Sequence, residues 1–272
     1  MEFSVLLSLY YKEQPSFLRQ SLDSILTQTV LPSEIVLVED GKLTPELDNV
    51  VEEYEKKYDI IKVIKLETNQ GLGKALNEGL RHCTYDIVAR MDTDDISKPE
   101  RFEKQIKEFE NDPDLCAVSS WIDEFHDNKD NVTSTRKVPE TNDEIVKYGK
   151  RRNPFNHPSV MFKKKEIEKV GGYKSFYLFE DYYLWARLIL NNCKLKNIQE
   201  SLLLFRANDE MFKRRGGWKY ALTEIKFQRR LNSIGYINFV EMMTNITLRT
   251  TTRMIPNKLR SAIYKFFLRK KK

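Results

Sequence analysis

The sequence is poor in the residues that define disulfide-rich, zinc-finger and low-complexity proteins. Its 272 residues include three cysteines, three histidines, ten glycines and nine prolines, and no repeat is visible. Cys83, Cys116 and Cys193 form an odd, widely spaced set without metal-ligand spacing, so we expect buried, reduced thiols in a cytosolic protein. The first residues lack the basic segment and the small-residue cleavage site of a signal peptide. Because no apolar run reaches about 18 residues, we also expect no membrane-spanning helix.

Acidic residues are missing from one end of the chain. Residues 242–272 contain nine lysines and arginines and no aspartate or glutamate, which leaves 37 basic and 40 acidic residues elsewhere. This asymmetry predicts a tail that meets an anionic surface. Leu259, Ile263 and Phe266 would form the apolar face of a basic amphipathic helix, which favours the plane of an anionic membrane. The alternative is a helix packed on the body with a solvated basic end.

What the sequence does contain is ample apolar material in an alternating pattern. Hydrophobic residues make up 40% of the chain and aromatic residues 11%, which is enough for a substantial core. Short β-branched runs alternate with segments of helical apolar spacing, which indicates βαβ units and a mostly parallel central sheet flanked by helices. We predict strands at residues 3–9, 35–38, 60–66, 85–89, 115–122 and 160–162, and helices near residues 17–26, 47–58, 74–80, 102–109, 180–190, 218–225 and 239–246.

Three helix starts carry sequence signals. Thr44 is followed by Pro45 and Glu46, the order of an N-cap, a first-turn proline and an early acid. Residues 97–100 (Ser-Lys-Pro-Glu) and 141–144 (Thr-Asn-Asp-Glu) have the spacing of a capping box, in which a hydroxyl accepts from a first-turn amide. We expect a helix to begin at each of these places.

Polar residues follow four of the predicted strands. Tyr11 follows the first strand, Asp40 follows the second and Lys74 opens the helix after the third. An acidic stretch, residues 92–95 (Asp-Thr-Asp-Asp), follows the fourth. Ligands of parallel sheets bind beyond the carboxyl ends of the strands, so these residues should converge on one edge. Strand alternation further predicts that one of Tyr10 and Tyr11 is buried and the other free to stack on a ligand.

The composition of the acidic stretch favours a positively charged partner. Its three carboxylates lie within four residues and repel one another, so the fold alone would not select them. Hard divalent cations take oxygen ligands and often bridge carboxylates to phosphate, which makes a cation a natural partner. The alternative for a bare Asp-x-Asp pattern is a solvated acidic turn.

Six short motifs occur in a fixed order along the chain. They are residues 8–13 (SLYYKE), 38–41 (VEDG), 69–77 (NQGLGKALN), 91–95 (MDTDD), 157–159 (HPS) and 180–182 (EDY). Together they resemble the family 2 glycosyltransferases of GT-A fold, particularly bacterial enzymes of surface-polysaccharide assembly. The likeness runs from Phe3 to about Phe205. It implies a GT-A domain over residues 1–210, with a Rossmann-like sheet, and a C-terminal amphipathic, basic helical region over residues 211–272.

The resemblance implies a metal-dependent donor site. Asp40 would bind the nucleotide base, Asp92 would lie toward the ribose, and Asp94 would bind the metal, Mn²⁺ or Mg²⁺, on the donor diphosphate. Asp92 is the second metal-ligand candidate, and Asp95 is the one expected to be structural.

Three further residues complete the implied donor site. Tyr11 and Glu13 come from the loop after the first strand. Many relatives have a serine and an arginine where this chain has Gly73 and Lys74. Lys74 would therefore contact the donor as a point charge, without the planar fork of an arginine.

The resemblance also implies the catalytic groups. Asp181 matches the base that deprotonates the acceptor hydroxyl, while Glu180 and His157 would lie on the acceptor side. From the residues alone, Asp181 could equally be an acid favoured by a helix N-terminus, and His157 a loop residue that only forms hydrogen bonds.

These implications define an activity. We expect an inverting transfer of a hexose, of galactose or glucose type, from a UDP-sugar to a lipid-linked saccharide, such as a polyprenyl-diphosphate-linked N-acetylhexosamine. The enzyme would be peripheral on the cytoplasmic face of the inner membrane, and its tail would bind the anionic membrane surface. One alternative is a sugar-nucleotide nucleotidyltransferase, although the loop after the first strand is not a glycine-rich phosphate loop. A more remote alternative is a nucleic-acid-binding protein; we expect no nucleic-acid partner because the body is slightly acidic.

Overall fold

The computed structural model describes residues 1–207 and 217–254. The predicted alternation of strands and helices is confirmed, and the observed bounds differ from the predicted ones by a few residues, except that α9 and α10 each end eight residues later than predicted. The strands are β1 (Ser4–Leu9), β2 (Glu34–Glu39), β3 (Ile61–Lys65), β4 (Ile87–Arg90), β5 (Ile96–Ser97), β6 (Leu115–Phe125), β7 (Val132–Arg136), β8 (Met161–Lys163) and β9 (Lys194–Arg206). The helices are α1 (Pro15–Leu26), α2 (Pro45–Lys57), α3 (Leu72–His82), α4 (Arg101–Asn111), α5 (Asn142–Gly149), η1 (His157–Ser159), α6 (Lys164–Lys169), α7 (Glu180–Leu190), α9 (Trp218–Ser233) and α10 (Phe239–Met254).

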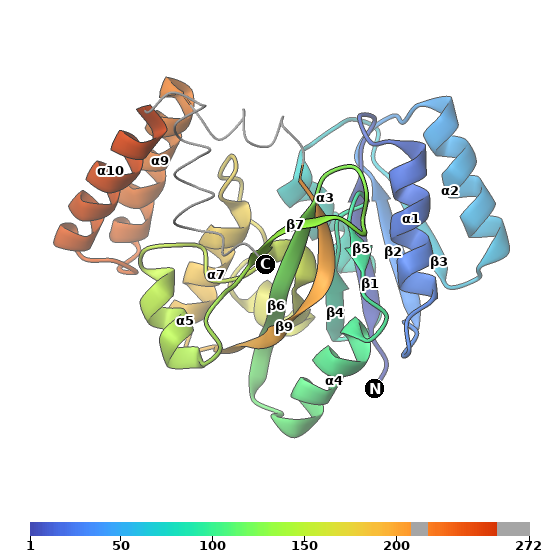
Figure 1. Ribbon diagram of the computed structural model, residues 1–272, viewed down its shortest axis with the longest axis horizontal. Coiled ribbons are helices and arrows are strands. Elements are labelled where there is room, and N and C mark those ends of the chain that lie inside the picture. The colour runs from blue at the N-terminus through green and yellow to red at the C-terminus, as the bar shows by residue number, and fades with distance from the viewer. Residues whose placement is uncertain (208–216, 255–272) are drawn as a thin grey trace.

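One mixed sheet runs through the middle of the described chain (Figure 1). Its order is β3-β2-β1-β4-β8-β6-β9-β5, with β7 paired to β6. The first four strands in this order are parallel, and β6 is parallel to β9. The short β8 is antiparallel to both β4 and β6, so β4 and β6 point the same way. The carboxyl ends of β1, β2, β4, β6 and β9 therefore lie at one edge of the sheet.

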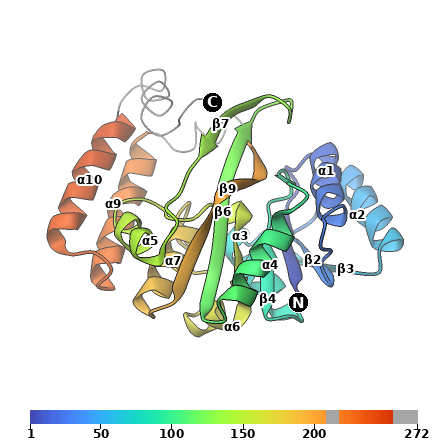
Figure 2. The same ribbon diagram turned by 60° about the horizontal axis from the view of Figure 1, so that its bottom comes forward.

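Helices cover both faces of the sheet, as Figure 2 shows. On one face, α1, α2 and α4 bury residues such as Leu22, Val50 and Phe102 against the sheet. On the other face, α3, α6 and α7 do the same through residues such as Leu76 and Trp185. Two apolar cores on either side of a β-layer make the three-layer arrangement of α/β proteins.

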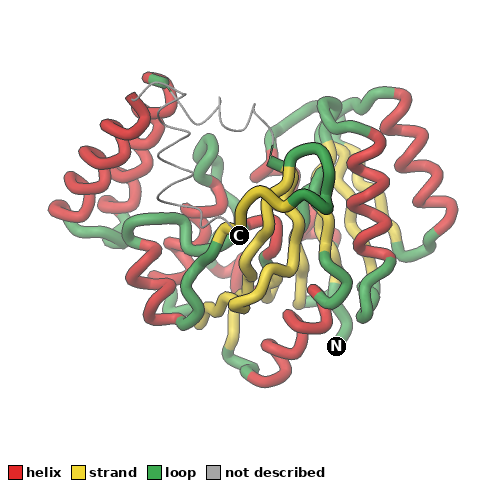
Figure 3. Tube along the Cα trace, in the orientation of Figure 1, coloured by secondary structure: helices red, strands yellow, loops and turns green. Residues whose placement is uncertain are grey.

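The helices α9 and α10 form a hairpin at the end of the molecule opposite α2 (Figure 3). Aromatic rings in and just before α7 pack against α9 and so join the hairpin to the body. The ring of Phe227 stacks on that of Phe179 with the ring centroids 4.4 Å apart. Lys150 on the body pairs with Glu241 of α10 at 3.0 Å. Within the described ranges, no helix is both long and apolar enough to cross a bilayer. The predicted tail helix beyond residue 254 lies outside the described residues.

The structure corrects three local predictions. The capping box at residues 141–144 is confirmed, and Thr44 caps α2, but the box at residues 97–100 is wrong. Ser97 belongs to β5 and its hydroxyl accepts a hydrogen bond from Arg101, so α4 begins without a side-chain cap. The prediction that one of two tyrosines is buried is also wrong, because Tyr10 and Tyr11 are both exposed. The strand ends at Leu9, and alternation stops there. Finally, the sequence reading missed the strands β5, β7 and β9.

Candidate active site

The carboxyl edge of the parallel strands carries the predicted acidic residues. The loop after β1 reaches the loop after β4, because Thr93 Oγ1 donates a hydrogen bond to Glu13 Oε2 at 3.0 Å. Helix α1 supports the same loop through Ser21, whose hydroxyl donates to the Asp92 carbonyl at 3.1 Å. The structure therefore brings Glu13 to the acidic stretch, as expected for a site built at this edge.

Carboxylates crowd together in the acidic stretch. Oxygen atoms of Asp92, Asp94 and Asp95 all lie within 4.8 Å of one another. Burial, together with the charges of Asp92 and Glu13, raises the pKa of Asp94 to about 7. Burial and the charge of Asp94 raise the pKa of Asp95 well above its ordinary value. A divalent cation would offset these repulsions, so the donor set fits Mn²⁺ or Mg²⁺.

Two arginines that the sequence reading missed hold this stretch. Arg90, the last residue of β4, is 1% exposed, and its Nη1 donates to Asp92 Oδ2 at 2.8 Å while Nη2 contacts the other oxygen. The backbone N–H of Arg206, at the end of β9, donates to Asp95 Oδ1 at 2.9 Å. The other oxygen of Asp95 is buried and has no hydrogen-bond partner in the part of the chain described. Arg90 thus anchors Asp92, and the backbone of Arg206 anchors one oxygen of Asp95.

Asp40 lies in the turn after β2 and is buried. Its two carboxylate oxygens accept from the backbone N–H groups of Gln70, at 2.6 Å, and Gly71, at 3.0 Å. The next residue, Gly41, has φ of 88°, and a Cβ there would lie 2.5 Å from the Asn69 nitrogen. Asp40 therefore joins the loops after β2 and β3, and these contacts are compatible with a donor-binding role that uses its remaining lone pairs.

The neighbouring residues Gly73 and Lys74 lie on different sides of helix α3. A Cβ on Gly73 would lie 3.4 Å from Glu180 Cγ and 3.6 Å from Tyr173 Cβ, so this glycine lets α3 approach the start of α7. Lys74 is exposed and lines a surface depression with Gln70 and Glu78. In the part of the chain that the structure describes, no hydrogen bond or ion pair joins Lys74 to the acidic stretch.

Helix α7 begins with an acidic pair, Glu180 and Asp181. Asp181 Oδ2 accepts a hydrogen bond from Asn153 Nδ2 at 2.5 Å, a partner that the sequence did not reveal. Burial, together with the charge of Asp181, raises the pKa of Glu180 to about 7. Backbone amides at a helix N-terminus favour carboxylates, which explains why two acids can share this place.

His157 and Tyr173 form a buried, hydrogen-bonded pair. His157 is 8% exposed, and its Nε2 shares a 2.8 Å hydrogen bond with the Tyr173 hydroxyl. Burial and the charge of Arg90 lower the pKa of His157 well below its usual value, so the imidazole is neutral. Burial raises the pKa of the Tyr173 hydroxyl, and the charge of Arg90, the arginine that holds Asp92, opposes this rise.

A three-layer α/β fold with crowded acids at the carboxyl edge of its parallel strands is the arrangement expected of a GT-A glycosyltransferase. The chain matches glycosyl transferase family 2 over residues 4–171 and belongs to that family. It is therefore a glycosyltransferase. The six motifs had pointed to this family, and the match confirms it.

Relatives cover nearly the whole chain. The chain is 44% identical over 269 residues to an Escherichia coli protein called UDP-Gal:alpha-D-GlcNAc-diphosphoundecaprenol beta-1,3-galactosyltransferase, covering 99% of this chain and 97% of the relative. It is 38% identical over 262 residues to the amylovoran biosynthesis glycosyltransferase AmsE of Erwinia amylovora, covering 96% and 97% of the two chains.

Solved structures share the fold at low sequence identity. The S. aureus protein TarS, residues 1–349 in complex with UDP-GlcNAc, gives a TM-score of 0.63 at 17% identity, over 98% of this chain and 73% of that one. The mannosyltransferase PcManGT of Pyrobaculum calidifontis, with GDP-Man and Mn²⁺, gives 0.62 at 16% identity, over 95% and 71%. These likenesses confirm the predicted GT-A fold.

Proposed function

We propose that this enzyme transfers galactose from UDP-galactose, with inversion, to an N-acetylhexosamine linked through diphosphate to a polyprenyl lipid. The observation that carries the proposal is the 44% identity, across nearly both full lengths, to the E. coli galactosyltransferase. The sugar in UDP-galactose is α-linked, and the name of that relative specifies a β product, so the same reaction here would invert the anomeric carbon. A role in bacterial surface-polysaccharide assembly follows from the same likeness.

The acids at the carboxyl edge would bind the donor. Asp94 and Asp92 would hold Mn²⁺ or Mg²⁺, which when bound supplies positive charge to the leaving nucleoside diphosphate. Glu13 is joined to the same stretch through Thr93, Tyr11 is exposed in the same loop as Glu13, and Asp40 would bind the nucleotide base. Arg90 keeps the Asp92 carboxylate in one orientation, and that carboxylate would face the ribose.

Asp181 would act as the base for the acceptor. As the acceptor hydroxyl oxygen bonds to the anomeric carbon, its proton moves to an Asp181 oxygen and the bond to the diphosphate breaks. The Asn153 amide holds the other Asp181 oxygen, which fixes the orientation of the carboxylate. The neutral His157 and Tyr173 pair supports this side of the site without adding charge.

The lipid-linked acceptor would bring the enzyme to a membrane surface. The hairpin of α9 and α10 exposes large apolar side chains, among them Trp218 at 63%, Phe239 at 66% and Val240 at 72%. Basic residues Lys219, Lys226 and Arg229 are exposed on the same hairpin. We therefore place the enzyme, as a proposal, on the cytoplasmic face of the inner membrane through this region and the basic residues that follow it.

A donor panel tests the proposed reaction. With a synthetic N-acetylglucosamine diphosphate lipid as acceptor, we expect UDP-galactose to be used at least about tenfold faster than UDP-glucose, UDP-N-acetylglucosamine or GDP-mannose. EDTA should abolish transfer, and Mn²⁺ or Mg²⁺ should restore it. Product formation is followed by mass spectrometry. Preference for a GDP-sugar would overturn the donor assignment, and full activity in EDTA would overturn the metal assignment.

A truncation tests the membrane proposal. Deleting residues 255–272 removes seven lysines and arginines. Because each basic residue near an anionic surface contributes about 1 kcal/mol, we expect vesicle binding to fall by more than about tenfold. Flotation with vesicles containing phosphatidylglycerol measures this, and vesicles of phosphatidylcholine alone provide the control. Equal flotation of the two proteins would contradict the role of the tail, and transfer to a water-soluble acceptor should be unchanged by the deletion.

A further inference from the structure

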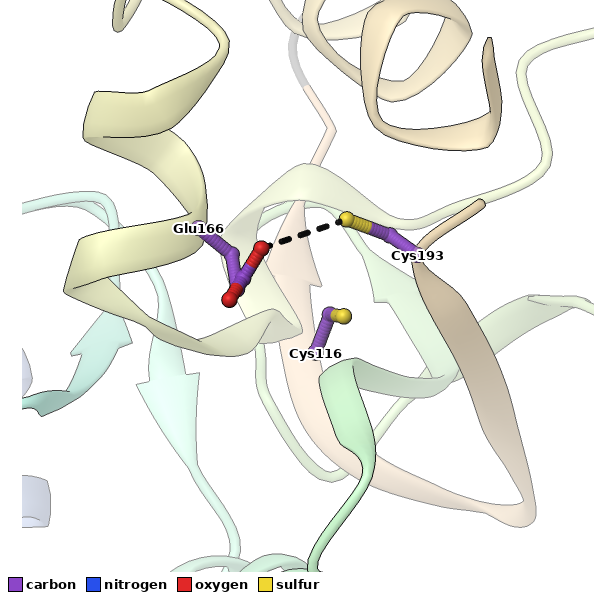
Figure 4. Close-up of side chains that lie close together, drawn as sticks. All are labelled: Cys116, Glu166 and Cys193. Carbon is purple, nitrogen blue, oxygen red and sulfur yellow. Dashed lines mark hydrogen bonds between the residues drawn. The ribbon is translucent and has the colours of Figure 1, made fainter. Parts of the chain in front are cut away.

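Two of the three cysteines meet at the edge of the sheet opposite the active site. Cys116 is the second residue of β6, and Cys193 directly precedes β9. Glu166, on α6, joins them from the other side, as Figure 4 shows. In the strand register, Ala117 is level with Phe162 of β8, and Phe162 is level with Val88 of β4. At about 3.3 Å per residue, the pair lies roughly 15–20 Å from the acidic stretch along the strands.

The three side chains converge with the spacing of metal ligands. One ligand atom from each of Cys116, Glu166 and Cys193 can be chosen so that all lie within 4.8 Å of one another. The thiol of Cys193 donates to Glu166 Oε2 at 3.8 Å. In a tetrahedral zinc site with bonds of about 2.3 Å to sulfur and about 2.1 Å to oxygen, neighbouring ligands are roughly 3.5–3.8 Å apart. Small side-chain shifts would therefore bring the three donors onto one ion.

The surroundings favour coordination over an inert thiol pair. Both cysteines are buried, whereas the Glu166 side chain is 19% exposed, which leaves an open side for a water molecule as fourth ligand. Lys169 pairs with Glu166 at 3.5 Å and would compete only weakly because it is exposed.

We propose that Cys116, Cys193 and Glu166 form a second metal site, which binds a borderline-soft divalent cation of the Zn²⁺ class. Thiolates select zinc, whereas the oxygen-only acidic stretch suits Mn²⁺ or Mg²⁺, so the two sites take different ions. The ion would link the starts of β6 and β9 to α6. Arg206, at the other end of β9, donates a hydrogen bond to Asp95. The metal would therefore stabilise the start of a strand whose end supports the acidic stretch.

Cobalt substitution tests the site directly. Reduced, metal-free protein is titrated with Co²⁺, whose bonds to thiolate give a charge-transfer absorption in the ultraviolet. We expect this absorption to saturate at one ion per chain and to be displaced by Zn²⁺. It should disappear in Cys116→Ser and in Cys193→Ser, and Glu166→Gln should weaken Co²⁺ binding at least about tenfold. Cys83→Ser and Asp94→Asn are the matched controls and should keep the absorption, because neither residue belongs to the cluster.

Several results would overturn the proposal. Absence of cobalt–thiolate absorption in the reduced wild type would overturn it, and this result depends on no variant. An unchanged absorption in both serine variants does so as well. Loss of two titratable thiols on mild oxidation, with no metal bound before or after reduction, would assign the pair to a disulfide instead. Zn²⁺ should also raise the Tm of Asp94→Asn, in which the acidic stretch lacks one ligand, and should leave the Tm of the double variant Asp94→Asn, Cys193→Ser unchanged.

Discussion

Asp181→Asn should lower kcat for transfer by about a thousandfold, which corresponds to about 4 kcal/mol of transition-state stabilisation. Asparagine keeps the shape of the side chain, and its oxygen can still accept from Asn153 Nδ2. What it loses is the capacity to take the proton of the acceptor hydroxyl. Donor affinity, measured by calorimetry with UDP, should stay within about twofold of wild type because the side-chain hydrogen bond of Asp181 is to Asn153 and not to the acidic stretch.

The neighbouring acid supplies the matched control for this substitution. Glu180 has a pKa raised to about 7 by burial, a value that also suits a general base. We expect Glu180→Gln to cost about tenfold or less in kcat, since Glu180 packs against Gly73 of α3. If Glu180→Gln caused the greater loss and Asp181→Asn kept most of the activity, the base would be Glu180. Loss of UDP binding in Asp181→Asn would instead point to a structural effect.

The backbone architecture was largely readable because its signals are local. The strands β1, β2 and β4 are short, buried runs bounded by turns, and the helices between them carry apolar residues at helical spacing. The strand β9 was not predicted because it is partly exposed and contains polar residues such as Gln199 and Glu200. It is held by its long pairing with β6, a contact that no local pattern reveals. The capping box predicted at residues 97–100 was wrong for a related reason. Ser97 belongs to β5, which pairs with β9, and this pairing is not visible in the local sequence.

The site could be predicted only in part. Its acids follow strand ends, and strand ends converge in any parallel sheet, so their gathering was predictable from position alone. The groups that hold them were not. Arg90 reads as an interruption of an apolar strand, Asn153 as one polar loop residue among several, and Arg206 as the end of an unpredicted strand. Each acquires its role from a partner that only the folded chain supplies. The meeting of Cys116 with Cys193 belongs to the same class.

Asp94→Asn should abolish transfer and at the same time stabilise the metal-free protein at alkaline pH. The ordinary pKa of 3.8 for this carboxyl is raised to about 7 in the fold by burial and by the charges of Asp92 and Glu13. A raised pKa means that ionised Asp94 is less favourable in the folded than in the unfolded chain. The penalty is therefore absent below the unfolded pKa, grows as pH rises, and is complete above the folded pKa.

The size and the pH window of this effect follow from the same shift. Because Asp94 is only partly buried, solvent screening reduces the penalty, and we expect asparagine to raise the free energy of unfolding by about 1–2 kcal/mol at pH 8. The gain should shrink through the range between the two pKa values and vanish near pH 4. Urea unfolding in EDTA at pH 4, 6 and 8 measures it, with the exposed Asp59→Asn as control.

Addition of metal should reverse the order of the two proteins. Saturating Mn²⁺ stabilises the wild type, because a bound ion cancels the repulsion among the three aspartates, but gives Asp94→Asn little or nothing. The wild type is then the more stable protein, and the only one of the two that transfers sugar. Equal stabilisation of both by Mn²⁺ would remove Asp94 from the ligand set, and a stability difference that did not depend on pH would show that its ionisation is not the cause. The charge repulsion among the aspartates destabilises the metal-free protein, and the same concentration of negative charge lets the acidic stretch bind a cation.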